Sequence, residues 1–133
     1  MKQFQESFDT PPLACLRDCD IVYLMFSMTS TLTFSRLPQW AAYIKRHAPD
    51  ALVYVVGNKS DDSFCRVVST AQGQQFASQE GFLYVESTSS QPHIVNALID
   101  QSVRTVIRRR QPDGQAPRRF RRLIPNSDCC PIL

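Results

Sequence analysis

The sequence predicts an α/β fold in which a parallel sheet is flanked by helices. Its 133 residues, 43% of them hydrophobic, are enough for one modest core and therefore for one domain. Apolar runs alternate three times with helical patterns, and short alternating units of this kind favour parallel strands with helices on the faces of the sheet. We therefore expect three consecutive β-α units.

Three short apolar runs are the predicted strands. They are "DIVYLMFSM" at 20–28, "ALVYVVG" at 51–57 and "GFLYVE" at 81–86. Each run is too short for a typical helix and is bounded by polar or turn-forming residues, which is typical of a strand buried on both faces.

Helical patterns follow each run. The first has apolar side chains at positions i, i+3, i+4 and i+7, namely Leu37, Trp40, Ala41 and Ile44. In the second, Ser69 and Gln72 form a capping-box pair and Gly81 is placed to end the helix. The third runs from about Pro92 to Arg109, and its largely apolar stripe consists of Val95, Leu98, Ile99, Ser102, Val103 and Val106.

The charge divides the chain into a mildly acidic body and a basic tail. Residues 1–102 carry seven Lys or Arg against ten Asp or Glu, a balance of −3, whereas residues 103–133 carry eight Arg against two Asp, a balance of +6. Beyond Arg110 the residues are rich in proline and show no apolar period, so we expect residues 111–133 to be disordered.

The cysteines and the N-terminus indicate a cytosolic chain. No run of eighteen apolar residues occurs, and "MKQFQESFDTPP" lacks the apolar stretch of a secretory signal. The five cysteines are therefore expected to be reduced, with Cys15, Cys19 and Cys65 as small core side chains. No Cys and His spacing indicates zinc, so no metal site is predicted.

Four segments in order resemble a small GTPase of the Ras superfamily, and the Rab family most of all. They are "RDCDIVYLMFSMTSTLTFSRLPQW", "VVGNKSD", "RVVSTAQGQQFA" and "VESTSS", within residues 17–109. The resemblance implies a truncated P-loop NTPase fold that retains three β-α units. It divides the chain into an atypical segment (1–16), a partial GTPase-like domain (17–110) and the tail (111–133).

The resemblance also implies a site that reads guanine. Its members would be Asn58, Lys59, Asp61, Thr88 and Ser89. In the family, the carboxylate at Asp61 accepts hydrogen bonds from the N1–H and exocyclic amine of guanine, Lys59 lies along the purine and Asn58 braces the loop. A backbone N–H near Ser89 meets the guanine oxygen, but Ser89-Ser90 stands where the family has alanine-lysine.

The departures from the family concern the phosphates. The chain contains no GxxxxGK[ST] loop, Asp9-Thr10 lacks the Gly-Gln that follows in the family, and Ser27 stands where the family usually has aspartate. We therefore expect no catalytic residue, no magnesium site and only weak binding of GTP or GDP. In the alternative interpretation, Asn58 and Asp61 only cap a loop after nucleotide binding was lost.

The predicted strand "IVYLMF" raises a structural question, because in the family it pairs with the phosphate-loop strand. Without that partner it would be an apolar sheet edge open to water. Either residues 1–16 cover this edge, or a partner protein covers it, or the chain is a shortened product of a longer protein.

The C-terminus predicts a lipid anchor. Cys130-Pro131-Ile132-Leu133 fits the C-a-a-X signal with leucine last, which favours geranylgeranyl, and Cys129 allows a second lipid. A prenyltransferase and the cytoplasmic face of a membrane are then partners, with a pool of the protein in the cytosol. An unmodified, solvated tail is the alternative, and no nucleic-acid-binding fold accompanies its arginines.

Together these features favour a membrane-anchored Rab-like protein that acts in vesicle trafficking or signalling by contacting an effector protein. The alternative is a working GTPase of which this chain is a shortened product.

Overall fold

A computed structural model of the chain describes residues 16–110. The elements in order are β1 (Ile21–Ser27), α2 (Thr31–Ser35), α3 (Leu37–His47), β2 (Leu52–Asn58), α4 (Thr70–Glu80), β3 (Leu83–Glu86) and α5 (Pro92–Arg110). The sheet is parallel with strand order β1-β2-β3, which confirms the predicted fold class. Expectations for the N-terminal segment, Cys15, the tail, Cys129 and Cys130 lie outside the described residues.

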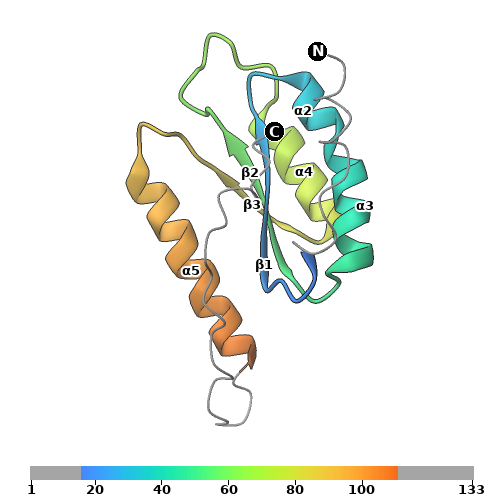
Figure 1. Cartoon of the computed structure of the whole chain (residues 1–133). Helices are drawn as coiled ribbons and strands as arrows, with labels where there is room; N and C mark the ends of the chain where they lie inside the picture. The colour runs from blue at the N-terminus through green and yellow to red at the C-terminus, as the bar shows by residue number, and fades with distance from the viewer. Residues whose placement is uncertain (1–15, 111–133) are drawn as a thin grey trace, which may run out of the picture.

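The sheet register brings the carboxyl ends of its strands to one edge. β1 pairs with β2 from Ile21 opposite Leu52 to Ser27 opposite Asn58, and β3 lies parallel along the other side of β2. The loops that follow β2 and β3 therefore leave from the same end of the sheet (Figure 1). Parallel α/β sheets bind ligands at this edge.

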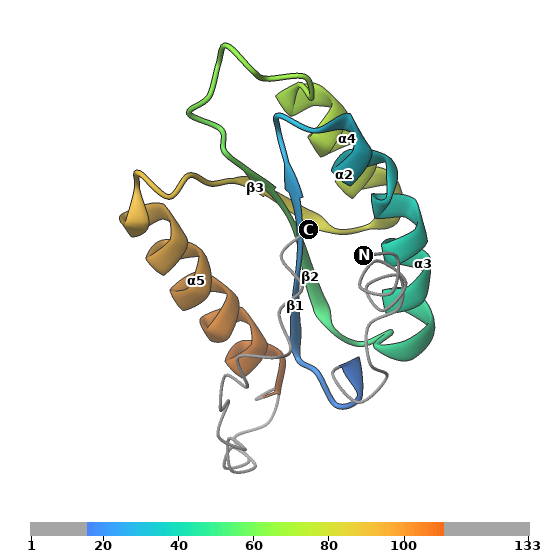
Figure 2. The same ribbon diagram turned by 45° about the horizontal axis from the view of Figure 1, so that its top comes forward.

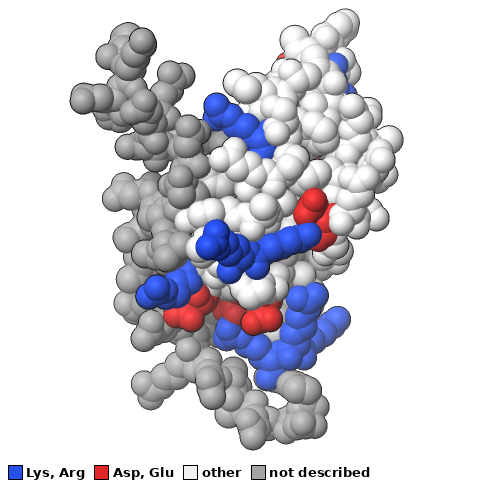
Figure 3. Space-filling model, turned by 90° about the vertical axis from the view of Figure 1, so that its right-hand side faces the viewer, with Lys and Arg blue, Asp and Glu red and all other residues white. Residues whose placement is uncertain are grey.

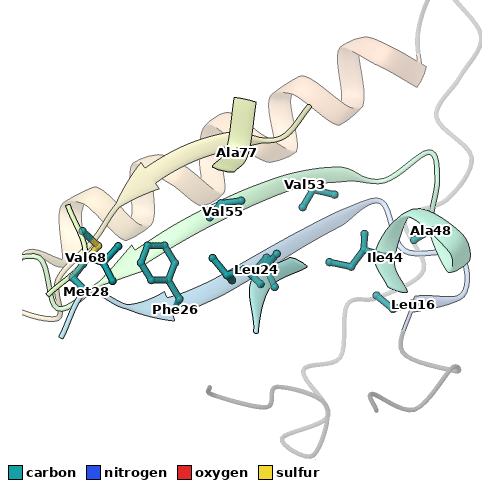
Figure 4. Close-up of a cluster of buried hydrophobic side chains, with 11 residues drawn as sticks. Leu16, Leu24, Phe26, Met28, Ile44, Ala48, Val53, Val55, Val68 and Ala77 are labelled. Carbon is teal, nitrogen blue, oxygen red and sulfur yellow. The ribbon is translucent and has the colours of Figure 1, made fainter. Parts of the chain in front are cut away.

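Helices cover the two faces of the sheet unequally. Helix α5 lies on one face, whereas α2, α3 and α4 lie on the other (Figures 1 and 2). The larger core lies under the second group, and Figure 4 shows part of it. Its buried members are Leu16, Leu24, Phe26, Met28, Leu37, Ile44, Ala48, Val53, Val55, Val68 and Ala77. The smaller core under α5 consists of Leu52, Tyr54, Val56, Leu98 and Val106.

Local sequence signals account for the helix boundaries. Ser69 and Gln72 form the predicted capping box, and Gly81 ends α4 with a φ of 72°, a left-handed conformation that glycine adopts without a Cβ clash. The structure adds the short helix α2, capped by the Ser30 side chain, before Arg36 and the proline in the first turn of α3. No helix in residues 16–110 is long and apolar enough to cross a membrane.

Two expectations about burial were wrong in part. Cys65 is exposed because it lies in the loop between β2 and α4, and Cys19 is only half-buried. On α5, Leu98, Ser102 and Val106 are buried, but Val95 is 37% and Ile99 47% exposed. The buried residues recur every fourth position and therefore form one line along the helix, which is narrower than the predicted stripe.

The polar residue within this buried line has a partner on β1. The hydroxyl of Ser102, which is completely buried, forms a hydrogen bond with the hydroxyl of Tyr23 and also donates to the carbonyl of Ile99. Among the described residues β1 pairs with β2 alone and is therefore an edge strand. The Tyr23–Ser102 contact and the packing of α5 help to hold β1 in place.

We predict that Gly73→Ala destabilises the chain although glycine-to-alanine changes usually favour a helix. A Cβ at Gly73 would lie 2.4 Å from the ring of Tyr84, which must then move. The expected loss is about 1–3 kcal/mol in the free energy of unfolding, measured in urea. Ser78→Ala, on the exposed side of the same helix, is the control. Equal or higher stability of Gly73→Ala would contradict this packing.

Candidate guanine-reading site

Two loops meet at the carboxyl end of the sheet. The first begins at Lys59 after β2, and the second begins at Ser87 after β3. Ser87 donates its backbone N–H to the carbonyl of Gly57 at 2.8 Å, while the backbone N–H and the hydroxyl of Ser60 donate to the carbonyl of Ser87 at 3.3 and 3.2 Å. These bonds hold the two loops side by side.

The first loop turns at Lys59, whose φ of 61° lies in the left-handed region. Its backbone N–H donates to the side-chain oxygen of Asn58 at 2.9 Å. This hydrogen bond joins the Asn58 side chain to the backbone of the turn. The role of Asn58 in bracing the loop stays a prediction. The turn leaves Lys59 exposed and is followed by Asp61.

The carboxylate of Asp61 joins the two loops through both of its oxygens. The hydroxyl of Thr88 donates to Oδ1 at 2.6 Å, and the hydroxyl of Ser90 donates to Oδ2 at 2.8 Å. The hydrogen bonds from Thr88 and Ser90, followed by a backbone bond within Asp61, lower the pKa of this carboxyl below its ordinary value. Asp61 is therefore an ionised acceptor on an exposed surface.

The residues expected to read guanine thus lie together at one edge of the sheet. Thr88 is buried and Ser89 is exposed next to it. Sequence reasoning missed Ser60, and it mentioned Ser90 only as a departure from the family. The sequence carries no signal that pairs either serine with its partner in the other loop, because each pair joins segments far apart in the chain.

A second polar group ties the start of α4 to the end of β3. One carboxylate oxygen of Glu86 accepts hydrogen bonds from Thr70 at 2.6 Å, Arg66 at 2.8 Å and the hydroxyl of Tyr84 at 2.9 Å. Burial alone raises the pKa of Glu86, but the bonds from Thr70, Arg66 and Tyr84 outweigh it and leave the pKa lowered. Glu86 immediately precedes the second loop, so this group positions both loops.

Nothing in residues 16–110 brings together three of the acidic, histidine or cysteine side chains that commonly hold a metal ion. Ser27, at the position where the family usually has aspartate, instead lies with its hydroxyl 2.8 Å from that of Thr29. Where the two loops meet, the carboxylate of Asp61 is a hydrogen-bond acceptor that lies next to hydroxyl groups and the exposed Lys59.

Comparison with known proteins identifies the family. The model of the Ras family matches residues 4–108. The chain belongs to the Ras family. Its relatives include the Ras-related protein SEC4 of Saccharomyces cerevisiae, 35% identical over 95 residues, which are 71% of this chain and 44% of that protein. The SEC4 protein of Candida albicans is 30% identical over 95 residues, 71% of this chain and 45% of its own length.

Human Rab-17 gives a longer match at lower identity. This Ras-related protein is 27% identical over 116 residues, 86% of this chain and 55% of its own length. The chain spans about half the length of these relatives. It is a Rab-like member of the Ras family, a family that binds guanine nucleotides in general, and the match includes part of the segment before residue 17.

We predict that Glu86→Gln destabilises the chain by about 1–2 kcal/mol at neutral pH, because it removes the charge from three hydrogen bonds. The pKa of Glu86 is lower in the folded chain, so its contribution is present above the unfolded pKa and is lost as the pH falls through the folded pKa. Urea unfolding at several pH values from about 7 to about 3 should show the difference between wild type and variant shrinking.

The control for this prediction is Glu80→Gln. Glu80 pairs with Lys45 at 2.6 Å near the surface, where one ion pair contributes about 0–1 kcal/mol. A loss in Glu86→Gln no larger than in Glu80→Gln would show that the Glu86 group does not position the loops.

Proposed function

We propose that this chain is a membrane-anchored Rab-like protein that acts through protein contacts in vesicle trafficking or signalling and has a degenerate nucleotide site. The observation that carries this proposal is the pair of loops in which Asp61 offers an exposed carboxylate next to Lys59, in a chain without a phosphate-loop motif. The family relationship supports a guanine preference for that carboxylate.

The free energy of the base contacts limits how tightly this site can bind a nucleotide. Two charge-assisted hydrogen bonds from guanine, with some stacking, give a net stabilisation of about 4 kcal/mol, which corresponds to a dissociation constant of about 1 mM. Tight binding in P-loop proteins depends on backbone N–H groups, a lysine and Mg²⁺ at the phosphates, and phosphoryl transfer uses the same groups. The chain therefore binds GTP or GDP weakly and does not hydrolyse GTP.

The alternative is a working GTPase of which this chain is one part. It is favoured by the fact that the chain covers only 44% of yeast SEC4 and 55% of human Rab-17. The transcript sequence upstream of Met1 distinguishes the two proposals, because an in-frame phosphate-loop motif there would assign the activity to a longer protein.

The membrane part of the proposal rests on the sequence of the tail. Helix α5 ends with Arg108, Arg109 and Arg110, and the chain then continues to the arginines at 118–122 and to Cys129-Cys130. On the body, positive and negative side chains lie close to one another on the face that Figure 3 shows, so the body offers no uniform positive field there for nucleic acid. The proposed partners are a prenyltransferase, the cytoplasmic face of a membrane and an effector protein.

The nucleotide proposal predicts that the purified chain with Mg²⁺ binds GTP no more tightly than about 100 µM in isothermal titration, because base contacts alone reach only the millimolar range. Where weak binding is measured, Asp61→Asn should weaken guanine nucleotides and leave adenine nucleotides unchanged. A micromolar constant for the original chain would overturn the degenerate site, and equal losses for both bases would remove Asp61 as the base reader.

The membrane proposal predicts that Cys129→Ser combined with Cys130→Ser releases the protein to the cytosol in cell fractionation. One prenyl chain anchors reversibly, so a second lipid or a basic patch must hold the protein. Replacing the four arginines at 118, 119, 121 and 122 by glutamine should loosen it only partly, since each contributes about 1 kcal/mol at an anionic leaflet. A double-serine variant that fractionates with membranes like the original would refute the anchor.

A further inference from the structure

Three side chains form a closed polar ring at the guanine-reading site. Thr88 and Ser90 donate to the two carboxylate oxygens of Asp61 at 2.6 and 2.8 Å, and the two hydroxyl oxygens lie 2.9 Å apart. Each hydroxyl has only one proton to donate. When both hydroxyl protons point to Asp61, no proton lies between the two hydroxyl oxygens. The ring therefore has three contacts but only two protons with which to form hydrogen bonds.

The two hydroxyl groups occupy different surroundings. Thr88 is buried with 4% of its surface exposed, whereas Ser90 is exposed. The backbone N–H of Ser90 also points to the hydroxyl oxygen of Thr88, at 3.3 Å. Thr88 therefore supports Asp61 from the protein side, while Ser90 contacts it from the solvent side, from which any base must approach.

We infer that Ser90 competes with a guanine base for Asp61, because its hydroxyl donates to Oδ2 from the exposed side of the carboxylate, the side from which a base must also donate. Guanine gains that oxygen when the Ser90 proton turns to the hydroxyl oxygen of Thr88, which lies within hydrogen-bond distance. Ser90 is thus a residue that sets the affinity of the site. This inference rests on the proposed guanine site and adds a regulating side chain to it.

The test is a titration of the isotopically labelled full chain with guanosine monophosphate, followed by NMR, with adenosine monophosphate as the comparison ligand. Ser90→Ala should bind guanosine monophosphate more tightly by roughly three- to tenfold, the factor that one net hydrogen bond provides. Its response to adenosine monophosphate should not change. Ser63→Ala is the matched control, because Ser63 is an exposed serine two residues after Asp61, and it should behave like the original chain.

An equal or weaker affinity of Ser90→Ala would overturn the inference and leave the guanine site intact, since Ser90 would then hold the carboxylate in its binding orientation. If neither protein responds to guanosine monophosphate, the guanine part of the proposed function falls, and the inference falls with it.

A second measurement tests the contact without a nucleotide. Hydrogen bonds from Thr88 and Ser90 keep the pKa of Asp61 low, so Ser90→Ala should raise it toward the ordinary value of a carboxyl group, as followed by NMR during a pH titration. Ser63→Ala should leave it unchanged. A pKa of Asp61 that is equal in Ser90→Ala and the original chain would refute the competition.

Discussion

The parallel pairing of β2 with both of its neighbours is the constraint on which the rest of the structure depends. Because all three strands run in one direction, each loop that leads from a strand to its helix leaves from the same edge of the sheet. Asp61 and Thr88 are 27 positions apart in the sequence and still lie within 2.6 Å of each other. An antiparallel third strand would place their loops at opposite ends.

The burial of β2 makes that pairing stable. Its first six residues are all buried, one face against the α3 and α4 side and the other against α5. Apolar burial of this kind contributes about 25 cal/mol per Å² and depends little on sequence detail. The polar contacts at the loops add less, but they decide which loop conformation the buried strand presents. Packing thus fixes the edge, and the hydroxyl and carboxylate groups shape it.

Much of the architecture could be predicted from the sequence because its signals are local. Alternating apolar runs gave the strands, and Ser69, Gln72 and Gly81 marked the ends of α4 without reference to the rest of the chain. The resemblance to the family identified the loop around Asp61. The exposure of Cys65 was missed because a loop residue and a core residue look alike in an apolar neighbourhood, and only the path of the chain separates them.

Contacts between distant segments are what the sequence could not provide. Nothing in "VESTSS" indicates that Ser90 meets Asp61, or that Glu86 gathers donors from the first turn of α4 and from the preceding loop. The pairs of Glu86 depend on the register of β3, because a shift of one residue would turn the Glu86 side chain to the other face of the sheet. The register of β3 therefore positions Glu86 as well as the packing of the strand.

The contact between Asp61 and Thr88 also explains why a base-reading motif by itself does not establish nucleotide binding. The same carboxylate ties the two loops together in the chain alone, so an aspartate there stabilises the fold whether or not a base is bound. Thr88 supports both loop stability and the proposed base recognition. Its hydrogen bond from the buried side joins the loops and also lowers the pKa of Asp61, which keeps the carboxylate ionised. In the proposed guanine site Ser90 separates the two roles, because a second donor on the solvent side holds the loops together and would hinder a base. Under the proposed function, the balance between loop stability and base recognition is therefore set at the solvent side of Asp61.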